Sequence, residues 1–251
     1  MDSGEDKEEK LQKVLARMGI ASRRTVENYI ADERVQVNGE IAHIGQRVNV
    51  EEDELCFDGV PLRVKPSLIY YLLHKPIGVI STAKDPQGRD TVVDLLPLEP
   101  RVFPVGRLDK ESEGLLIVTN DGDLTYRLTH PSHGVEKEYL VAVQGKVSRG
   151  NLRKLREGIE LEDGITAPAK VSQIDDGLVK IIIHEGKNRQ VRRMFQLIGH
   201  PVKRLVRTRI GSLVDHKLQS GQWRLLTALE LLDFESSTAL AGRESDGKAE
   251  K

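Results

Sequence analysis

The sequence contains almost no cysteine and no long apolar run, and its charges nearly cancel. The single cysteine, Cys56, excludes an intrachain disulfide and any multi-cysteine zinc site. No segment approaches the stretch of about 18 apolar residues that a membrane-spanning helix requires. The formal net charge is −1, so the composition as a whole does not indicate a nucleic-acid partner. A net charge near zero can still include a strongly basic segment that is balanced by an acidic one elsewhere in the chain.

The composition that remains is that of a folded protein. The chain has 251 residues, 38% apolar and 31% charged, which suffices for one large core or for two domains. Its first ten residues, MDSGEDKEEK, are acidic and polar, unlike a secretory signal or a transit peptide, so a cytoplasmic location is predicted. Residues 1–8 and 235–251 are polar with mixed charge and are predicted to be disordered tails.

Residues 9–62 predict a small domain made of two short helices and a hairpin. Apolar residues at helical spacing, followed by a glycine that can cap the C-terminus, indicate the first helix: Leu11, Val14, Leu15, Met18 and Gly19. Ser22 can cap a second helix, whose apolar face includes Val26 and Ile30. The segment VQVNGEIAHI alternates around Asn38-Gly39, a strong signal for a hairpin with a two-residue turn.

Basic residues cluster near the turn between these two expected helices: Arg17, Arg23 and Arg24. At that position they could neutralise the phosphates of a nucleic acid. The charges alone are a weak signal, because arginines at the start of a helix more often form an ordinary solvated surface.

Residues 67–233 predict a second domain, joined to the first by a linker around PLRVKP, residues 61–66. Strands are expected over LIYYLLHK (68–75), KEYLVAV (137–143) and LVKIII (178–183). The segment GVISTAKDPQGRDTVVDLLP (78–97) is expected to begin as a strand and to continue as a loop. Short helices are expected over 123–128 and 151–156.

The stretch VGRLDKESEGLLIVTNDG, residues 105–122, joins a turn to a buried strand. The turn carries Arg107 and Asp109, and the apolar run from 115 to 118 forms the strand. An arginine two residues away would keep the Asp109 carboxylate ionised by lowering its pKa. On the residues alone, Asp109 is either a functional carboxylate or one more solvated loop residue, and most carboxylates are solvated.

The segment HEGKNRQVRRMFQLIGHPVKRLVRTR, residues 184–209, is strongly basic. It contains a single acid, Glu185, and the following cations: Lys187, Arg189, Arg192, Arg193, Lys203, Arg204, Arg207 and Arg209. Apolar residues at helical spacing predict a helix that Asn188 caps, with Met194 facing the core rather than a cofactor. Gly186-Lys187 lacks the upstream glycine of a Walker A loop, which argues against nucleotide binding. The outward cations are either a solvated surface or, with RNA, a phosphate track.

Residues 10–48 resemble the S4 RNA-binding domain over nearly its full length. The motifs that follow resemble, in order, those of the RsuA/RluB-type ribosomal RNA pseudouridine synthases, and are closest to the RluB-like branch: HKP (74–76), GRLD (106–109), NDG (120–122), K-x-Y (137–139) and GKNRQVRRMF (186–195). The resemblance implies an α+β fold. An S4 domain of two helices plus a hairpin would precede a catalytic domain with a mixed, largely antiparallel sheet and an active cleft across it.

The resemblance also assigns roles to residues that match the family motifs. Asp109 would be the catalytic residue, and Tyr139 would stack on the target uracil and move a proton, whereas a tyrosine in a strand is ordinarily a packing residue. Arg192 would pair with Asp109, and Arg107 would fill the gap left by the flipped base. Further residues are expected to bind substrate: Lys75, Lys187, Asn188, Arg189, Gln190 and Arg193. The S4 residues expected to bind RNA are Arg17, Ser22, Arg23 and Arg24.

The implied activity is the site-specific isomerisation of uridine to pseudouridine in structured ribosomal RNA. The 23S RNA of the large subunit is favoured, the 16S RNA is the alternative, and a non-catalytic S4 ribosome assembly factor is a further alternative. The reaction needs no cofactor, and no metal is expected because His130 and His133 have no third ligand nearby. A monomer that binds neither a membrane nor a nucleotide cofactor is expected.

Overall fold

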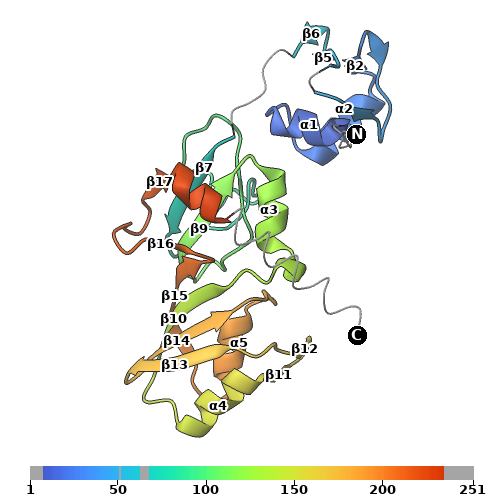
Figure 1. The fold of residues 1–251 in the computed structure, drawn as a ribbon. Coiled ribbons are helices and arrows are strands. Elements are labelled where there is room, and N and C mark those ends of the chain that lie inside the picture. Colours follow the sequence, from blue (N-terminus) through green and yellow to red (C-terminus); the bar gives the residue numbers. More distant parts are fainter. Residues whose placement is uncertain (1–7, 51, 63–67, 235–251) are drawn as a thin grey trace. The chain divides into compact units, whose positions relative to one another are not determined.

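The computed structural model describes residues 8–50, 52–62 and 68–234. The chain divides into two compact units, Met1–Leu68 and Ile69–Lys251 (Figure 1). The segments expected to be disordered tails lie outside the described residues, apart from Glu8. The same holds for the expected linker apart from Pro61, which ends a strand, and Leu62. No helix in the described part of the chain is long and apolar enough to cross a membrane.

The first unit contains two helices and short strands, as the sequence predicts. Its elements are β1 (Glu9–Lys10), α1 (Leu11–Arg17), α2 (Arg23–Ala31), β2 (Val35–Val37), β3 (Glu40–Ile41), β4 (Arg47–Val48), β5 (Leu55–Phe57) and β6 (Val60–Pro61). Gly19 ends the first helix with a φ of 85°, and Ser22 accepts a hydrogen bond from the Thr25 N–H at 3.2 Å. Asn38 and Gly39, with φ of 54° and 83°, form the turn of the β2–β3 hairpin.

The second unit is built on one mixed sheet. Its elements are β7 (Tyr70–Lys75), β8 (Phe103–Pro104), β9 (Glu113–Thr119), α3 (Gly122–Thr129), the short 3-10 helix η1 (Pro131–His133), β10 (Lys137–Val143), α4 (Arg149–Glu157), β11 (Glu160–Leu161), β12 (Gly164–Ile165), β13 (Lys170–Asp175), β14 (Leu178–Ile183), α5 (Gln190–Leu197), β15 (Val202–Ile210), β16 (Leu213–Val214) and β17 (Trp223–Leu225). Residues 228–234 are also helical.

The main path of the sheet is β13-β14-β10-β15-β9-β7-β17. Each neighbouring pair along it is antiparallel except β15 and β9, which run parallel. This confirms the expected mixed, largely antiparallel sheet. Every residue of β9 is buried, because helices or loops cover both faces of this central strand, and its uninterrupted apolar run suits that position.

The parallel pairing of β9 with β15 is the junction between two halves of the sheet. It consists of Glu113 opposite Val206 and Gly114 opposite Arg207. Arg207 adds a hydrogen bond from Nε to the carbonyl oxygen of Leu115 at 2.7 Å. On one side of the junction α4 and α5 pack on β10, β14 and β15, and on the other α3 packs on β7 and β9 (Figure 1). Residues that lie far apart in the sequence therefore meet above the junction.

The segment after β7 differs from its prediction. Residues 78–97 form no regular strand and contribute one isolated bridge, between Ile80 and Thr91. Val79, Val92 and Leu96 are buried against the face of β7 and β9 that lies opposite α3. Packing of these apolar residues, rather than strand pairing, holds the segment, which explains why its apolar character resembled that of a strand.

Candidate active site

Asp109 lies in the loop that connects β8 to β9. The residue before it, Leu108, is anchored through its backbone: Ser81 Oγ donates to the Leu108 carbonyl at 2.9 Å and accepts from the Leu108 N–H at 3.1 Å. The Ser112 N–H closes the loop on the Asp109 carbonyl at 3.0 Å. The carboxylate is half-buried, and it forms no ion pair among the described residues. The Arg107 side chain is exposed, and no ion pair joins it to this carboxylate among the described residues.

Lys75 supports this loop from inside the protein. Its side chain is fully buried, and Nζ donates to the carbonyl oxygens of Ser112 at 2.8 Å and Pro76 at 2.9 Å. Burial lowers the pKa of Lys75 to about 8, while the charges of Asp109 and Glu111 oppose that shift. In this structure the side chain has no exposed surface, and its hydrogen bonds go to backbone carbonyls of the protein rather than toward a pocket open to substrate. Its position makes it a support for the catalytic loop.

Two arginines of the third motif also contact this loop. Arg192 Nη2 donates to the Glu111 carbonyl at 2.8 Å and to Ser112 Oγ at 3.3 Å. Arg189 forms an ion pair with the Glu111 carboxylate at 2.6 Å. Arg192 therefore contacts the loop of Asp109 rather than the carboxylate itself, which corrects the expected direct pair. Burial lowers the pKa of Arg192, neighbouring Arg189 adds to this, and Asp109 and Glu111 oppose it.

Tyr139 reaches the same place from β10. It lies opposite Arg207 of β15 and Ile181 of β14 in the sheet, and it is 8% exposed. A pocket of about 90 Å³ brings it together with Asp109, between apolar walls that include Ile183 and Leu205. The K-x-Y strand and the GRLD loop, which are separate motifs in the sequence, therefore share one cavity.

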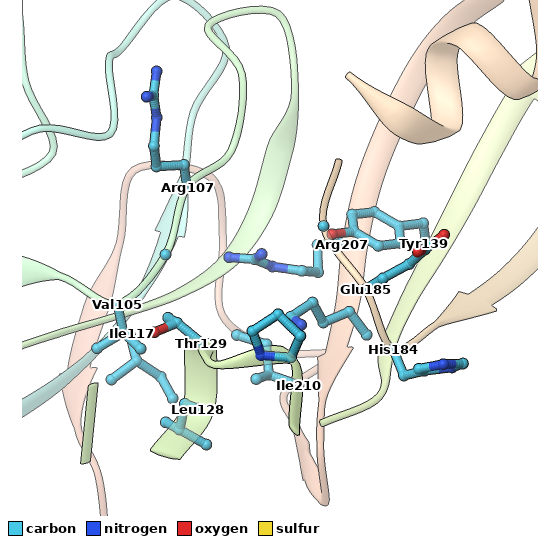
Figure 2. Close-up of a pocket in the computed structure, with 14 residues that line it drawn as sticks. Val105, Arg107, Ile117, Leu128, Thr129, Tyr139, His184, Glu185, Arg207 and Ile210 are labelled. Atoms are coloured by element: carbon cyan, nitrogen blue, oxygen red, sulfur yellow. The ribbon is translucent and has the colours of Figure 1, made fainter. Parts of the chain in front are cut away.

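A second pocket of about 310 Å³ adjoins the first and shares Tyr139, Arg107 and Gly186 with it (Figure 2). Arg107 extends away from Arg207 and Tyr139 in Figure 2. The wall of this pocket also contains Lys137 and Arg207. The site prediction missed Arg207 because its burial depends on the pairing of β15 with β9, and the only signal in the sequence was its place in a basic segment.

The remaining cations of the third motif are engaged inside the protein. Arg193 forms a two-pronged ion pair with Asp163, with both contacts at 2.8 Å, and Lys187 Nζ donates to the Asp163 carbonyl at 2.8 Å. Gln190 donates to Glu185 and accepts from the Lys187 N–H. These contacts fix the β11–β12 hairpin and the start of α5. In the expected phosphate track, acids from elsewhere in the chain pair with Arg189, Arg193, Arg204 and Arg209.

The start of α5 also corrects a predicted cap. The N-cap position is Arg189, in a left-handed conformation with a φ of 47°, and it makes no side-chain capping hydrogen bond. Asn188 is exposed and lies before the cap, so it does not cap the helix. Its exposure leaves it available for the expected contact with substrate.

In the first unit, Arg23 and Arg24 are exposed at the start of α2. Arg17 forms a two-pronged ion pair with Glu9, at 2.8 and 2.9 Å, so its charge is already matched. Ser22 caps the helix through its side chain, which gives it a structural role. Arg23 and Arg24 are therefore the strongest candidates for phosphate contacts in this unit.

A helix-hairpin module followed by a mixed sheet, with a loop aspartate and a strand tyrosine in one cavity, defines a class: an RNA-modifying enzyme that carries its own RNA-binding domain. Comparison with protein families agrees. Residues 69–197 match the RNA pseudouridylate synthase family, and residues 9–55 match the S4 domain. The chain belongs to the RNA pseudouridylate synthase family, and it is an RNA pseudouridine synthase with an N-terminal S4 domain.

Individual relatives support the same assignment. The chain is 42% identical to a ribosomal large subunit pseudouridine synthase B of Bacillus subtilis, over 89% of this chain and 94% of that protein. It is 40% identical to an uncharacterized RNA pseudouridine synthase of Aquifex aeolicus, over 93% of this chain and 96% of that protein. A crystal structure of a pseudouridylate synthase superposes with a TM-score of 0.66 at 33% identity, covering 90% of this chain and 99% of that one.

Proposed function

We propose that this enzyme converts a specific uridine of 23S ribosomal RNA to pseudouridine, with Asp109 as the catalytic group. The observation that carries the proposal is the pocket shared by Asp109 and Tyr139, in which Asp109 is the only carboxylate among the described lining residues. The choice of RNA is supported by the relatives named as large-subunit enzymes. The 16S RNA is the second candidate. We further propose that the enzyme is a cytoplasmic monomer.

The reaction breaks the bond between N1 of the uracil and C1′ of the ribose, turns the freed base, and joins C5 to C1′. The proton lost from C5 is balanced by a proton gained at N1. Nothing is oxidised or reduced, so the chemistry requires a group that activates the sugar–base unit and a cavity that retains the freed base. Asp109 supplies the first, as nucleophile or as base. Arg192 and Lys75 both donate hydrogen bonds to backbone carbonyls of its loop, which keeps the carboxylate oriented while water is excluded.

Tyr139 supplies much of the cavity. A base that leaves a helix loses a few kcal/mol of stacking and pairing. Stacking on an aromatic ring returns about 1–3 kcal/mol per base. Ile183 and Leu205 provide apolar walls beside the ring, which suit the flat faces of a uracil. The tyrosine hydroxyl is then the group that moves a proton to or from the turning base.

The proposal is tested by offering the purified enzyme deproteinised 23S RNA, 16S RNA and a tRNA pool in parallel. Tritium release from RNA labelled at C5 of uridine measures turnover, because binding alone cannot exchange that hydrogen. Mapping of pseudouridine in each RNA identifies the target. Product in 23S RNA alone supports the proposal. Product confined to 16S RNA or tRNA overturns the choice of RNA, and no tritium release from any of them overturns the enzymatic assignment.

Replacing Tyr139 with phenylalanine is expected to lower kcat by about 10²- to 10⁴-fold, the usual contribution of a proton-transferring group. RNA affinity should stay within a few-fold, because the ring remains available for stacking. Tyr139→Ala should weaken RNA binding as well. Tyr126→Phe is the matched control, since Tyr126 is 57% exposed on α3 and does not line the pocket of Asp109. Full activity of Tyr139→Phe would leave only a packing role.

Removing the two exposed arginines at the start of α2, in Arg23→Ala/Arg24→Ala, is expected to raise KM while kcat changes little. Each lost phosphate contact should reduce the slope of log Kd against log salt by about 0.7–0.9. Filter binding over a range of NaCl concentrations measures the slope. Arg153→Ala is the control, because Arg153 is also exposed but lies on α4 of the second unit, paired with Glu157. An unchanged slope in the double variant would show that these arginines make no phosphate contact.

A further inference from the structure

Arg207 is a buried cation that has no role in the chemistry proposed for Asp109 and Tyr139. It is 3% exposed, and its Nε is bonded to the Leu115 carbonyl at 2.7 Å. Its Nη2 is also buried and has no hydrogen-bond partner among the described residues. A buried donor without a partner is costly, and more so when it is charged. Figure 2 shows the side chain extending from β15 into the larger pocket, toward the side lined by Val105 and Thr129.

A second cation lines the same pocket. Lys137 lies on β10, two residues before Tyr139, and its Nζ contacts the Val135 carbonyl at 3.2 Å. Burial and, as the smaller cause, the neighbouring charge of Arg207 together lower the pKa of Lys137 to about 8. Two like charges are therefore held close together in a partly dry site, which is unfavourable unless an anion joins them.

The walls of the larger pocket do not supply that anion. Glu185 is the only carboxylate among the described lining residues. It already accepts hydrogen bonds from the Ala167 N–H at 2.9 Å and from the Gln190 side chain. Asp109 lines the smaller pocket and not this one. The larger pocket is thus lined by three cations, Arg107, Lys137 and Arg207. The Glu185 carboxylate in its wall is already hydrogen-bonded to other groups.

The size and position of the pocket indicate where the anion comes from. At about 310 Å³ it is larger than a single phosphate requires, and part of its wall is apolar, including Val105, Leu128 and Ile210. It meets the pocket of Asp109 at Tyr139, where the flipped base would stack. A strand of RNA whose base enters the smaller pocket must place an adjacent nucleotide and its phosphate within reach of the larger one.

We propose that the larger pocket is a subsite for the nucleotide next to the target uridine, and that Arg207 and Lys137 bind the phosphodiester linking the two. The assignment rests on the proposed function, because the course of the RNA strand is inferred from a target uridine flipped into the pocket of Asp109. Arg207 contributes Nη2 as a charged donor and Lys137 contributes its ammonium group, and charged donors form the stronger hydrogen bonds to phosphate. The phosphate supplies the counter-charge that the buried pair lacks.

The decisive experiment compares RNA fragments that contain the mapped target uridine and carry one neutral methylphosphonate in place of a phosphate, moved position by position. Kd is measured by fluorescence anisotropy for the wild type, Arg207→Met and Lys137→Met. The wild type is expected to lose affinity about tenfold or more at one phosphate beside the target uridine. Arg207→Met should bind unmodified RNA more weakly by a similar factor and lose nothing further at that position. Arg207→Lys, which keeps the charge, should restore part of the affinity.

Lys137→Met guards against a folding artefact, because Lys137 makes one hydrogen bond, to the Val135 carbonyl, whereas Arg207 helps to hold the sheet junction. If the wild type and both variants lose the same affinity at every substituted phosphate, the subsite is overturned. Turnover of the same RNA by the wild type would still leave the proposed function intact.

If no RNA is modified, the proposed function fails, and a second measurement decides the subsite without RNA. Inorganic phosphate at constant ionic strength should protect Lys137 from amine acetylation in the wild type, and equal labelling with and without phosphate overturns the proposal.

Discussion

Asp109→Asn is expected to abolish pseudouridine formation, with a loss in kcat of about 10⁴-fold or more, the scale seen when an essential nucleophile or base is removed. The amide has nearly the same shape as the carboxylate but can neither attack carbon nor take up a proton. RNA affinity should remain within a few-fold of the wild type, because Asp109 forms no ion pair among the described residues and its loop is held by other groups. Tritium release under single-turnover conditions, together with filter binding, measures both quantities.

Glu111→Gln is the matched control, since it removes a carboxylate two residues away in the same loop. It deletes the ion pair with Arg189, but the hydrogen bond from Arg192 goes to the Glu111 carbonyl and survives. Exposed ion pairs contribute about 0–1 kcal/mol, so a fall in kcat of a few-fold is expected. If Asp109→Asn retained turnover comparable to that of Glu111→Gln, the assignment of Asp109 as the catalytic group would be overturned.

The local elements of this protein could be predicted from the sequence because their signals are local. The strands Lys137–Val143 and Leu178–Ile183 have the bounds that their apolar patterns predict. The hairpin turn at Asn38-Gly39 and the cap at Ser22 depend on residues within a few positions of each other. In each case the physical cause lies inside the segment, so a few neighbouring residues of the sequence are enough to predict the element.

The partners of the charged groups could not be predicted, because they come from distant segments. The sequence shows the basic segment 184–209 with a single acid of its own, but in the structure Arg189 pairs with Glu111 and Arg193 with Asp163. Lys75 resembles an ordinary residue at the end of a strand, and its burial under the catalytic loop depends on the pairing of β7 with β9. Motif resemblance located the site, whereas tertiary pairing decided which of its cations are still free to meet RNA.

The same dependence on tertiary pairing makes Gly114 the position at which a single methyl group should do most damage to stability. Its φ is +111°, and a Cβ placed on it would lie 2.2 Å from the Arg207 carbonyl oxygen and 2.5 Å from the Arg207 nitrogen. Both are backbone atoms of β15, so neither can rotate away. Gly114→Ala is therefore expected to cost about 4 kcal/mol or more in the free energy of unfolding. That cost corresponds to a fall in Tm of about 8–16 °C for a domain of this size.

Gly145→Ala separates the effect of crowding from that of backbone conformation. Gly145 also has a positive φ, +71°, but a Cβ there would meet nothing within 4 Å. Its substitution should cost only the conformational strain, about 1–2 kcal/mol. Thermal melts followed by circular dichroism compare the two variants. Because Gly114 lies where β9 meets β15, Gly114→Ala should also displace the Asp109 loop from Tyr139 and lower activity below the melting transition. Equal melting temperatures for the two variants would show that the junction between the half-sheets yields to a methyl group.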